Sequence, residues 1–227
     1  KYPDVMLQAC ASGGGRVDYG SLPYHDEFWT SDNTDALQRV YMQYATNLIY
    51  PPVATASHVS ASPGHQTGSI TPLKFRFDVA MSGRLGLELQ PKDIPAEEMA
   101  FAREAIANYK THVRELVTKG DLYRLISPYE CTNNHAANLL VRKDKSKAVL
   151  FAYCTGFNRR GIRPTVHLHG LDASKRYRIT EINKAGKRKA FWGEGHIYDG
   201  TYLQQVGIEL QIARQYDSAV FLLEEVK

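Results

Sequence analysis

The sequence has 227 residues, a formal net charge of +4, and 43% hydrophobic and 23% charged residues. This is the composition of an ordinary globular chain with one large or two modest domains. Its three cysteines, Cys10, Cys131 and Cys154, are odd in number and lack CxxC spacing. Their pattern argues against a disulfide framework or zinc knuckle and favours a reducing, cytoplasmic compartment.

Several classes of partner are excluded by the absence of their sequence signals. No apolar run has the length of a membrane span, so we expect no membrane association. The basic cluster around Gly186 has no interleaved aromatic residues, which argues against nucleic-acid binding. The triplet Gly13 to Gly15 is not part of a nucleotide-binding motif, and we expect neither a cofactor nor a metal ion.

In chain order, the first predicted element is a strand over residues 5–10, because this apolar run is too short for an amphipathic helix. The glycine triplet after Cys10 lets the backbone adopt positive φ and lets a ligand approach the N–H groups. An equally acceptable interpretation is a tight turn that follows a buried, inert thiol.

The second predicted strand ends at Phe28 and Trp29, and a helix follows over residues 34–47. The apolar side chains of this helix recur at i, i+3 and i+4; they are Leu37, Val40, Tyr41, Tyr44 and Leu48. Asp32 therefore lies at the carboxyl end of a strand, on the same rim as the glycine turn. Its alternative role is an N-cap of the helix.

Further along, residues 48–50 indicate a third strand end, followed by a long loop with His58 and His65 that lacks the spacing of a metal site. Residues 75–81 predict a fourth strand and residues 82–86 a turn. A helix is expected from Pro95 to Lys119. Beyond Asn138 the pattern predicts an antiparallel sandwich, with strands over residues 148–153, 165–169, 177–182, 202–210 and 219–223.

Five motifs in order, Cys10 to Arg16, Trp29 to Asp35, His58 to Ser60, His65 to Gly68 and Thr71 to Leu73, resemble those of the microbial α-galactosidases of glycoside hydrolase family 36. The resemblance implies an α/β and all-β chain. Residues 1–127 are expected to form the C-terminal half of a (β/α)8 TIM barrel, and residues 128–227 a β-sandwich. The sandwich is expected to brace the barrel or serve assembly into a homo-oligomer.

The resemblance also implies a retaining mechanism with two carboxylates. Asp32 resembles the general acid/base, and Cys10 and Gly13 resemble the residues that contact the galactose hydroxyls. Trp29 is expected to stack on the sugar or pack beneath it, with Ser31 and Asn33 as further substrate contacts.

The family's nucleophile lies in a Lys-Trp-Asp motif, which this chain lacks. We therefore expect a fragment whose partners are an α-galactoside and the missing N-terminal part of the enzyme. A galactosyltransferase of the raffinose synthase kind uses the same residues and stays an alternative. So does a non-catalytic galactoside-binding or assembly subunit.

Overall fold

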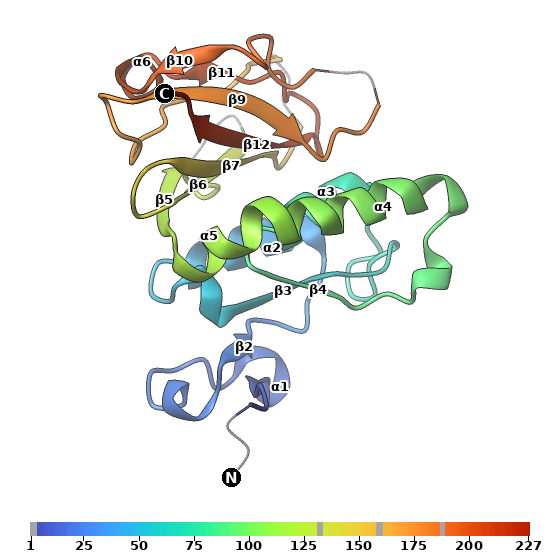
Figure 1. Cartoon of the computed structure of the whole chain (residues 1–227). Coiled ribbons are helices and arrows are strands. Elements are labelled where there is room, and N and C mark those ends of the chain that lie inside the picture. The colour runs from blue at the N-terminus through green and yellow to red at the C-terminus, as the bar shows by residue number, and fades with distance from the viewer. Residues whose placement is uncertain (1–3, 131–133, 158–160, 187–188) are drawn as a thin grey trace.

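Three layers build up the molecule in the computed structural model: a parallel sheet, a layer of helices and a pair of antiparallel sheets (Figure 1). The structure describes residues 4–130, 134–157, 161–186 and 189–227, so Cys131 and part of the basic cluster around Gly186 lie outside it. Within these ranges no helix is long and apolar enough to cross a membrane.

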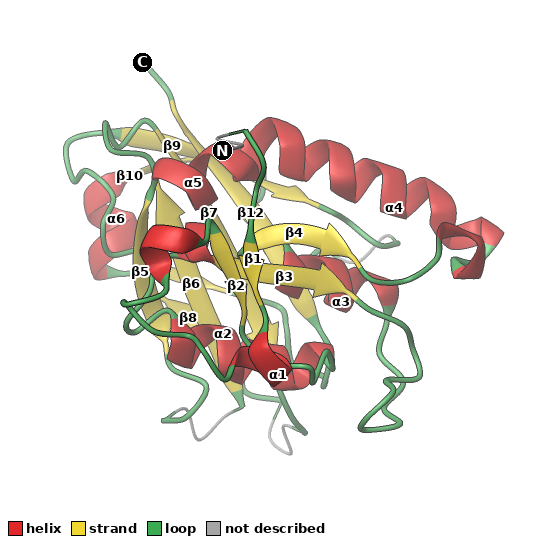
Figure 2. Ribbon diagram, turned by 90° about the horizontal axis from the view of Figure 1, so that it is seen from below, coloured by secondary structure: helices red, strands yellow, loops and turns green. Residues whose placement is uncertain are grey.

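The parallel sheet has the strand order β1-β2-β3-β4. Its strands are β1 (Gln8–Ala9), β2 (Glu27–Trp29), β3 (Thr55–Val59) and β4 (Arg84–Leu87). Because every neighbouring pair is parallel, all four carboxyl ends lie at one edge of the sheet (Figure 2). A parallel sheet with helices in its connections is the expected part of a (β/α)8 barrel.

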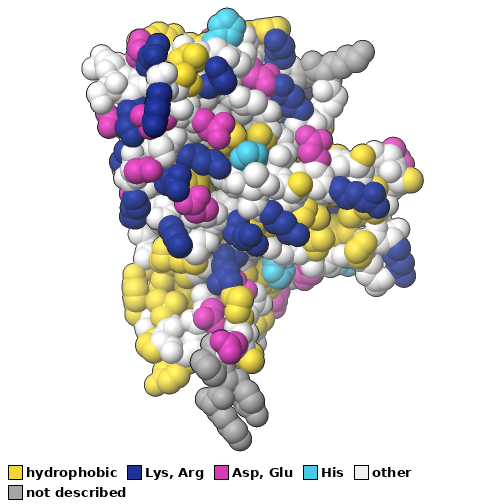
Figure 3. Space-filling model, in the orientation of Figure 1, with side chains coloured by type: hydrophobic (Ala, Val, Ile, Leu, Met, Phe, Trp, Pro, Cys, Tyr) yellow, Lys and Arg dark blue, Asp and Glu magenta, His cyan; other side chains and the backbone are white. Residues whose placement is uncertain are grey.

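The first predicted strand is shorter and more exposed than expected. Val5, Met6 and Leu7 are 56%, 57% and 51% exposed, because β1 is an edge of the sheet and no described element covers its outer side. Tyr19 and Ile49 are exposed as well, and the Tyr19 hydroxyl donates to the Ile49 carbonyl. Figure 3 shows hydrophobic side chains gathered at this lower, N-terminal end of the molecule.

Two strand predictions were wrong. Residues 48–50 form a turn after α2 (Ala36–Thr46), and the third strand is β3, which carries His58. Residues 75–80 belong to helix α3 (Leu73–Ala80), Met81 is its C-cap, and β4 occupies most of the predicted turn. Helix α3 lies between the sheet and the C-terminal layer and is buried on most of its faces. Its sequence alternates apolar residues with Lys74, Arg76 and Asp78, which has the period of a strand and not that of an amphipathic helix.

The long predicted helix is present but interrupted. It consists of α4 (Ala96–Asn108), a π-helical turn (Tyr109–Val113) and α5 (Arg114–Lys119). The π turn holds Tyr109, whose hydroxyl donates to the Gly83 carbonyl at 3.1 Å and accepts from the Leu85 N–H at 3.2 Å. The helix is thereby fixed to the start of β4.

Tyr109→Phe removes both hydrogen bonds and leaves the ring in place. Because the Gly83 carbonyl and the Leu85 N–H then lose their partner, we expect the free energy of unfolding to fall by about 1–3 kcal/mol. Urea unfolding of the chain measures this change. Tyr24→Phe, at an exposed tyrosine, is the control; an equal effect of both variants would contradict this role of the Tyr109 hydroxyl.

The C-terminal layer has a six-stranded sheet of order β10-β9-β12-β7-β6-β5 and a two-stranded sheet β11-β8. The strands are β5 (Asp121–Ile126), β6 (His135–Val141), β7 (Lys147–Cys154), β8 (Thr165–Val166), β9 (Arg176–Ile182), β10 (Ile197–Asp199), β11 (Ile208–Glu209) and β12 (Ser218–Glu225). The strands predicted over residues 148–153, 177–182 and 219–223 are confirmed as β7, β9 and β12. Of the strand predicted over residues 165–169, only two residues form β8. Strands β5, β6 and β10 were not predicted.

The predicted strand over residues 202–210 was wrong, because α6 (Gly200–Gln205) precedes the short β11. The missed signal is Gly207, whose φ of +77° and N–H bond to the Tyr202 carbonyl end the helix. The remaining short elements are α1 (Ala11–Gly14) and three 3-10 turns at Leu22–Tyr24, Pro52–Ala54 and Pro91–Asp93.

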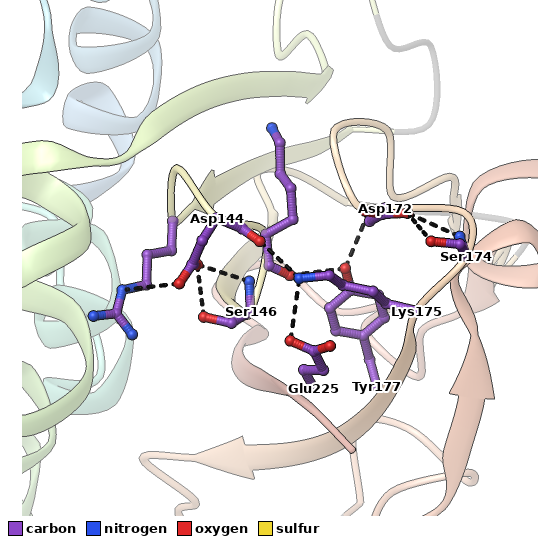
Figure 4. A network of polar contacts seen from close by, with 9 residues as sticks. Asp144, Ser146, Asp172, Ser174, Lys175, Tyr177 and Glu225 are labelled. Carbon is purple, nitrogen blue, oxygen red and sulfur yellow. Dashed lines mark hydrogen bonds and ion pairs between the residues drawn. The ribbon is translucent and has the colours of Figure 1, made fainter. Parts of the chain in front are cut away.

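Polar contacts fix one end of the six-stranded sheet (Figure 4). Two turns have the form Asp-x-Ser, in which the carboxylate accepts from the N–H and hydroxyl of the serine, namely Asp144 with Ser146 and Asp172 with Ser174. Lys175 Nζ donates to the Asp144 carbonyl at 2.7 Å and pairs with Glu225 at 3.1 Å. We assign these contacts a structural role. Among the described residues, no group of three His, Cys, Asp or Glu side chains could hold a metal ion.

Candidate active site

The turns that follow β1 and β2 pack directly against each other. After Cys10 the backbone adopts positive φ at four consecutive residues, with +57° at Ser12, +70° at Gly13 and +94° at Gly14. A Cβ on Gly13 would lie 2.8 Å from the Asp32 backbone nitrogen and 2.9 Å from Oδ2. Only glycine fits this contact, so the left-handed turn serves to bring the chain against Asp32.

Asp32 is exposed at the carboxyl end of the sheet. The Trp29 indole N–H donates to its Oδ1 at 3.1 Å, and Gln66 Nε2 donates to its backbone carbonyl at 3.2 Å. The alternative role of Asp32 as the N-cap of α2 is wrong, because Asp35 holds that position and accepts from the Gln38 N–H at 3.0 Å. The Asp32 carboxylate is therefore oriented by an indole and a neighbouring turn.

The other predicted site residues lie in the same two turns. Cys10 has an exposed thiol where β1 ends. The Ser31 hydroxyl accepts from the Asn33 N–H, and Asn33 Oδ1 accepts from the Asp35 N–H, both at 3.1 Å. These side chains shape the turn around Asp32; their contact with substrate stays a prediction.

Arg39 is a central residue that the sequence reasoning missed. It is 3% exposed, and its guanidinium donates to the carbonyls of Asn33 at 2.9 Å and Ser31 at 2.8 Å and to the Thr30 hydroxyl. The guanidinium carbon Cζ of Arg39 lies 4.2 Å from the centroid of the Trp29 ring. The available signal was an arginine on the buried helix stripe that also includes Ala36, Val40 and Gln43.

The charge of Arg39 is also buried behind the site. Burial lowers its pKa to about 10, although the carboxylates of Glu88 and Asp32 act in the opposite direction. The guanidinium is therefore charged at neutral pH. From helix α2 it donates hydrogen bonds to the carbonyls of the turn, and it places a positive charge near the Asp32 carboxylate.

His58 and Asp35 complete the surroundings. The His58 ring lies 4.4 Å from the Trp29 ring, on strand β3 rather than in the predicted loop. Asp35 accepts hydrogen bonds from Thr67 at 2.7 Å and from Ser69, which fixes the loop after β3. Burial raises the pKa of Asp35, but the hydrogen bonds, from Ser69 above all, outweigh it and keep this pKa below its usual value.

Comparison with known proteins identifies the family. The melibiase family model matches residues 1–120, and that of the glycosyl hydrolase family 36 C-terminal domain matches residues 135–223. The chain belongs to glycoside hydrolase family 36. Relatives include α-galactosidase 2 of Hypocrea jecorina, 39% identical over 226 residues, and AgaA of Geobacillus stearothermophilus, 37% identical over 210 residues. These matches cover 99% and 92% of this chain but 28% and 27% of the relatives.

Solved structures of family 36 share the fold. A variant of AgaA in complex with raffinose has a TM-score of 0.88 at 36% identity, and the galactosidase domain of the α-galactosidase-sucrose kinase AgaSK has 0.87 at 34%. Each match covers 99% of this chain and 29% of the other. The resemblance that the motifs indicated is confirmed, and so is the combination of barrel strands with a C-terminal β domain.

The half-buried His58 of this family 36 site predicts a pH dependence. Burial lowers the pKa of His58, while Glu88 opposes this shift and Arg39 adds to it. Near and below the ordinary histidine pKa of about 6.5, the unfolded chain therefore binds more protons than the folded chain. The free energy of unfolding then decreases as the pH is lowered. Urea unfolding at about pH 7.5 and about pH 5.5 should show this loss, reduced in His58→Gln. If the exposed-site control His169→Gln reduces it equally, the assignment to His58 is wrong.

Proposed function

We propose that residues 1–227 form the acid/base side of an α-galactosidase active site that removes terminal α-galactosyl units from galacto-oligosaccharides with retention of configuration. The packing of Gly13 on Asp32 carries this proposal, because it joins a carboxylate to a ligand-accessible backbone turn at the carboxyl edge of barrel strands. Support comes from the relatives, which are named α-galactosidases, and from the AgaA variant solved with raffinose.

In the proposed reaction the Asp32 carboxyl donates its proton to the glycosidic oxygen as the bond to the anomeric carbon breaks. A nucleophilic carboxylate from a part of the enzyme outside these residues attacks that carbon and forms a glycosyl-enzyme. The Asp32 carboxylate then takes a proton from water, which displaces the enzyme and releases galactose. The Cys10 thiol and the Gly13 N–H bind the galactose hydroxyls, next to Trp29.

The proposal requires a protein partner for the open sheet. The four-stranded sheet has β1 and β4 as edges, and Val5, Met6 and Leu7 are exposed beside β1. Unpaired edges and contiguous apolar side chains favour packing against further chain. The chain also spans about 28% of the length of the curated relatives that it matches. We propose that the rest of the barrel covers these surfaces; homo-oligomer formation stays a prediction.

A chimera tests the function. Residues 1–227 replace the matching segment of Geobacillus AgaA, and galactose release is measured with raffinose and with an aryl α-galactoside. We expect release from both substrates, and a strongly reduced rate on raffinose after Asp32→Asn. A chimera that melts cooperatively but releases no galactose from either substrate would refute the proposal. Products formed with an added sugar acceptor distinguish hydrolysis from galactosyl transfer.

The same chimera tests Arg39 as a residue that positions the turn. Arg39→Met removes the donors that hold the carbonyls of Ser31 and Asn33, and small misplacement of a catalytic group costs up to about 100-fold in rate. We expect kcat/KM to fall about 10- to 100-fold, mostly through kcat, with partial recovery in Arg39→Lys, which restores the charge without the planar donor set. Arg103→Met, at an exposed arginine of α4, is the control. A loss in KM alone would contradict the positioning role.

A further inference from the structure

A cavity of about 480 Å³ lies between the connections that follow β3 and β4, beneath the C-terminal layer. Its walls include polar and apolar side chains from four segments, among them Ile70, Arg76, Leu89, Asp93, Glu98 and Tyr216. Its lining includes none of the residues assigned above to the site around Asp32. Its volume falls in the range of about 300–1,000 Å³ that is usual for pockets that bind small molecules.

Arg76 is a cationic residue of this wall with one unpaired donor. Its Nη1 donates to the Ser60 carbonyl at 2.6 Å, but its buried Nε–H has no hydrogen-bond partner among the described residues. Glu98 is close enough to oppose the lowering of the Arg76 pKa by burial, yet the two form no ion pair in the described chain. A buried donor without a partner in a cavity wall indicates a ligand or water that supplies an acceptor.

The charges in the wall select the kind of ligand. The carboxylates of Asp93 and Glu98 repel an anion, and the guanidinium of Arg76 repels a cation. A neutral molecule with hydroxyl groups can accept from Arg76 and donate to both carboxylates. The apolar side chains then contact its C–H faces; Ile70, 75% exposed at the mouth, is one of them.

We propose that this cavity binds a neutral pyranose unit at a site separate from Asp32. The preference for an α-galactoside rests on the proposed function, whereas the preference for a neutral hydroxylated ligand rests on the cavity alone. Both connections leave the carboxyl edge of the sheet, the edge that also carries the proposed active site. It would hold an oligosaccharide on the enzyme without taking part in the reaction.

Nuclear magnetic resonance of the 227-residue chain tests the site. Raffinose is titrated into protein with labelled isoleucine and leucine methyl groups and a labelled tryptophan indole. The methyl signals of Ile70, Leu89 and Ile94 should shift with a dissociation constant on the order of 1–10 mM, and Arg76→Met should weaken this binding at least about tenfold. Arg103→Met should leave it unchanged. The Trp29 indole signal reports the Asp32 site independently, so failure of either proposal is seen separately.

Three results would overturn the sugar site: methyl signals that do not move at saturating raffinose, equal affinity in Arg76→Met, or a response to inorganic phosphate in place of raffinose. If Arg76→Met does not melt cooperatively, Glu98→Gln takes its place. This change removes the negative charge and replaces one of the two acceptor oxygens by an amide donor, and it breaks no ion pair seen in the described chain. Weakened binding in Glu98→Gln supports the site, and unchanged binding contradicts it.

Discussion

Asp32→Asn in the chimera is expected to lower kcat/KM for raffinose by about 10²- to 10⁴-fold, the usual contribution of a general acid/base. Asparagine keeps the size of the side chain and the acceptor for the Trp29 indole N–H, but it has no proton to donate to the leaving sugar. An aryl α-galactoside, whose leaving group needs little protonation, should lose less in the first step. The difference between the two substrates is therefore the diagnostic quantity.

Asp199→Asn, at an exposed aspartate of the C-terminal sheets, is the matched control and should leave both substrates unaffected. An equal loss on raffinose and the aryl galactoside would mean that Asp32 maintains the turn against Gly13 and does not transfer the proton. Unchanged rates on both would remove Asp32 from the reaction altogether.

The sequence predicted the elements whose residues carry their own local signal. Helix α2 has an apolar stripe with helical spacing, and Asp32 follows a strand and precedes that helix, so its place at the carboxyl edge could be read from chain order. Helix α3 could not be recognised, because its apolar and charged residues alternate with the period of a strand while most of its faces are buried. The division into residues 1–127 and 128–227 stays a prediction; β5 already belongs to the six-stranded sheet.

The sequence indicated the two turns that meet at Asp32, but not the residues that hold them, and the roles of the predicted site residues stay predictions. Gly13 and Asp32 are 19 positions apart, and their contact depends on a left-handed turn whose exact path follows from packing. Arg39 binds backbone carbonyls, which every residue offers, so no side-chain pattern marks its partners. Sequence reasoning identifies the groups that do chemistry more readily than the groups that hold them.

Asp78→Ala is expected to lower the free energy of unfolding by about 3–5 kcal/mol, because it leaves Lys74, whose side chain is only 17% exposed, and two buried donors without their partner. Asp78 lies in α3 and is fully buried. Its carboxylate accepts from Lys74 Nζ at 2.6 Å, the Ser218 hydroxyl at 2.7 Å and the Asn183 amide at 3.1 Å. Two of these donors belong to the C-terminal layer, so the aspartate joins that layer to the helices.

Urea unfolding of the chain, followed by both fluorescence and circular dichroism, measures this effect, and the two probes should separate if the layers lose their connection. Asp121→Ala is the matched control, since Asp121 pairs with Lys143 at the surface, where the side chains are 38% and 70% exposed. An exposed pair contributes about 0–1 kcal/mol. A loss in Asp78→Ala as small as in Asp121→Ala would show that the layers are held together by apolar contacts such as Phe75 with Tyr153, and not by the buried carboxylate.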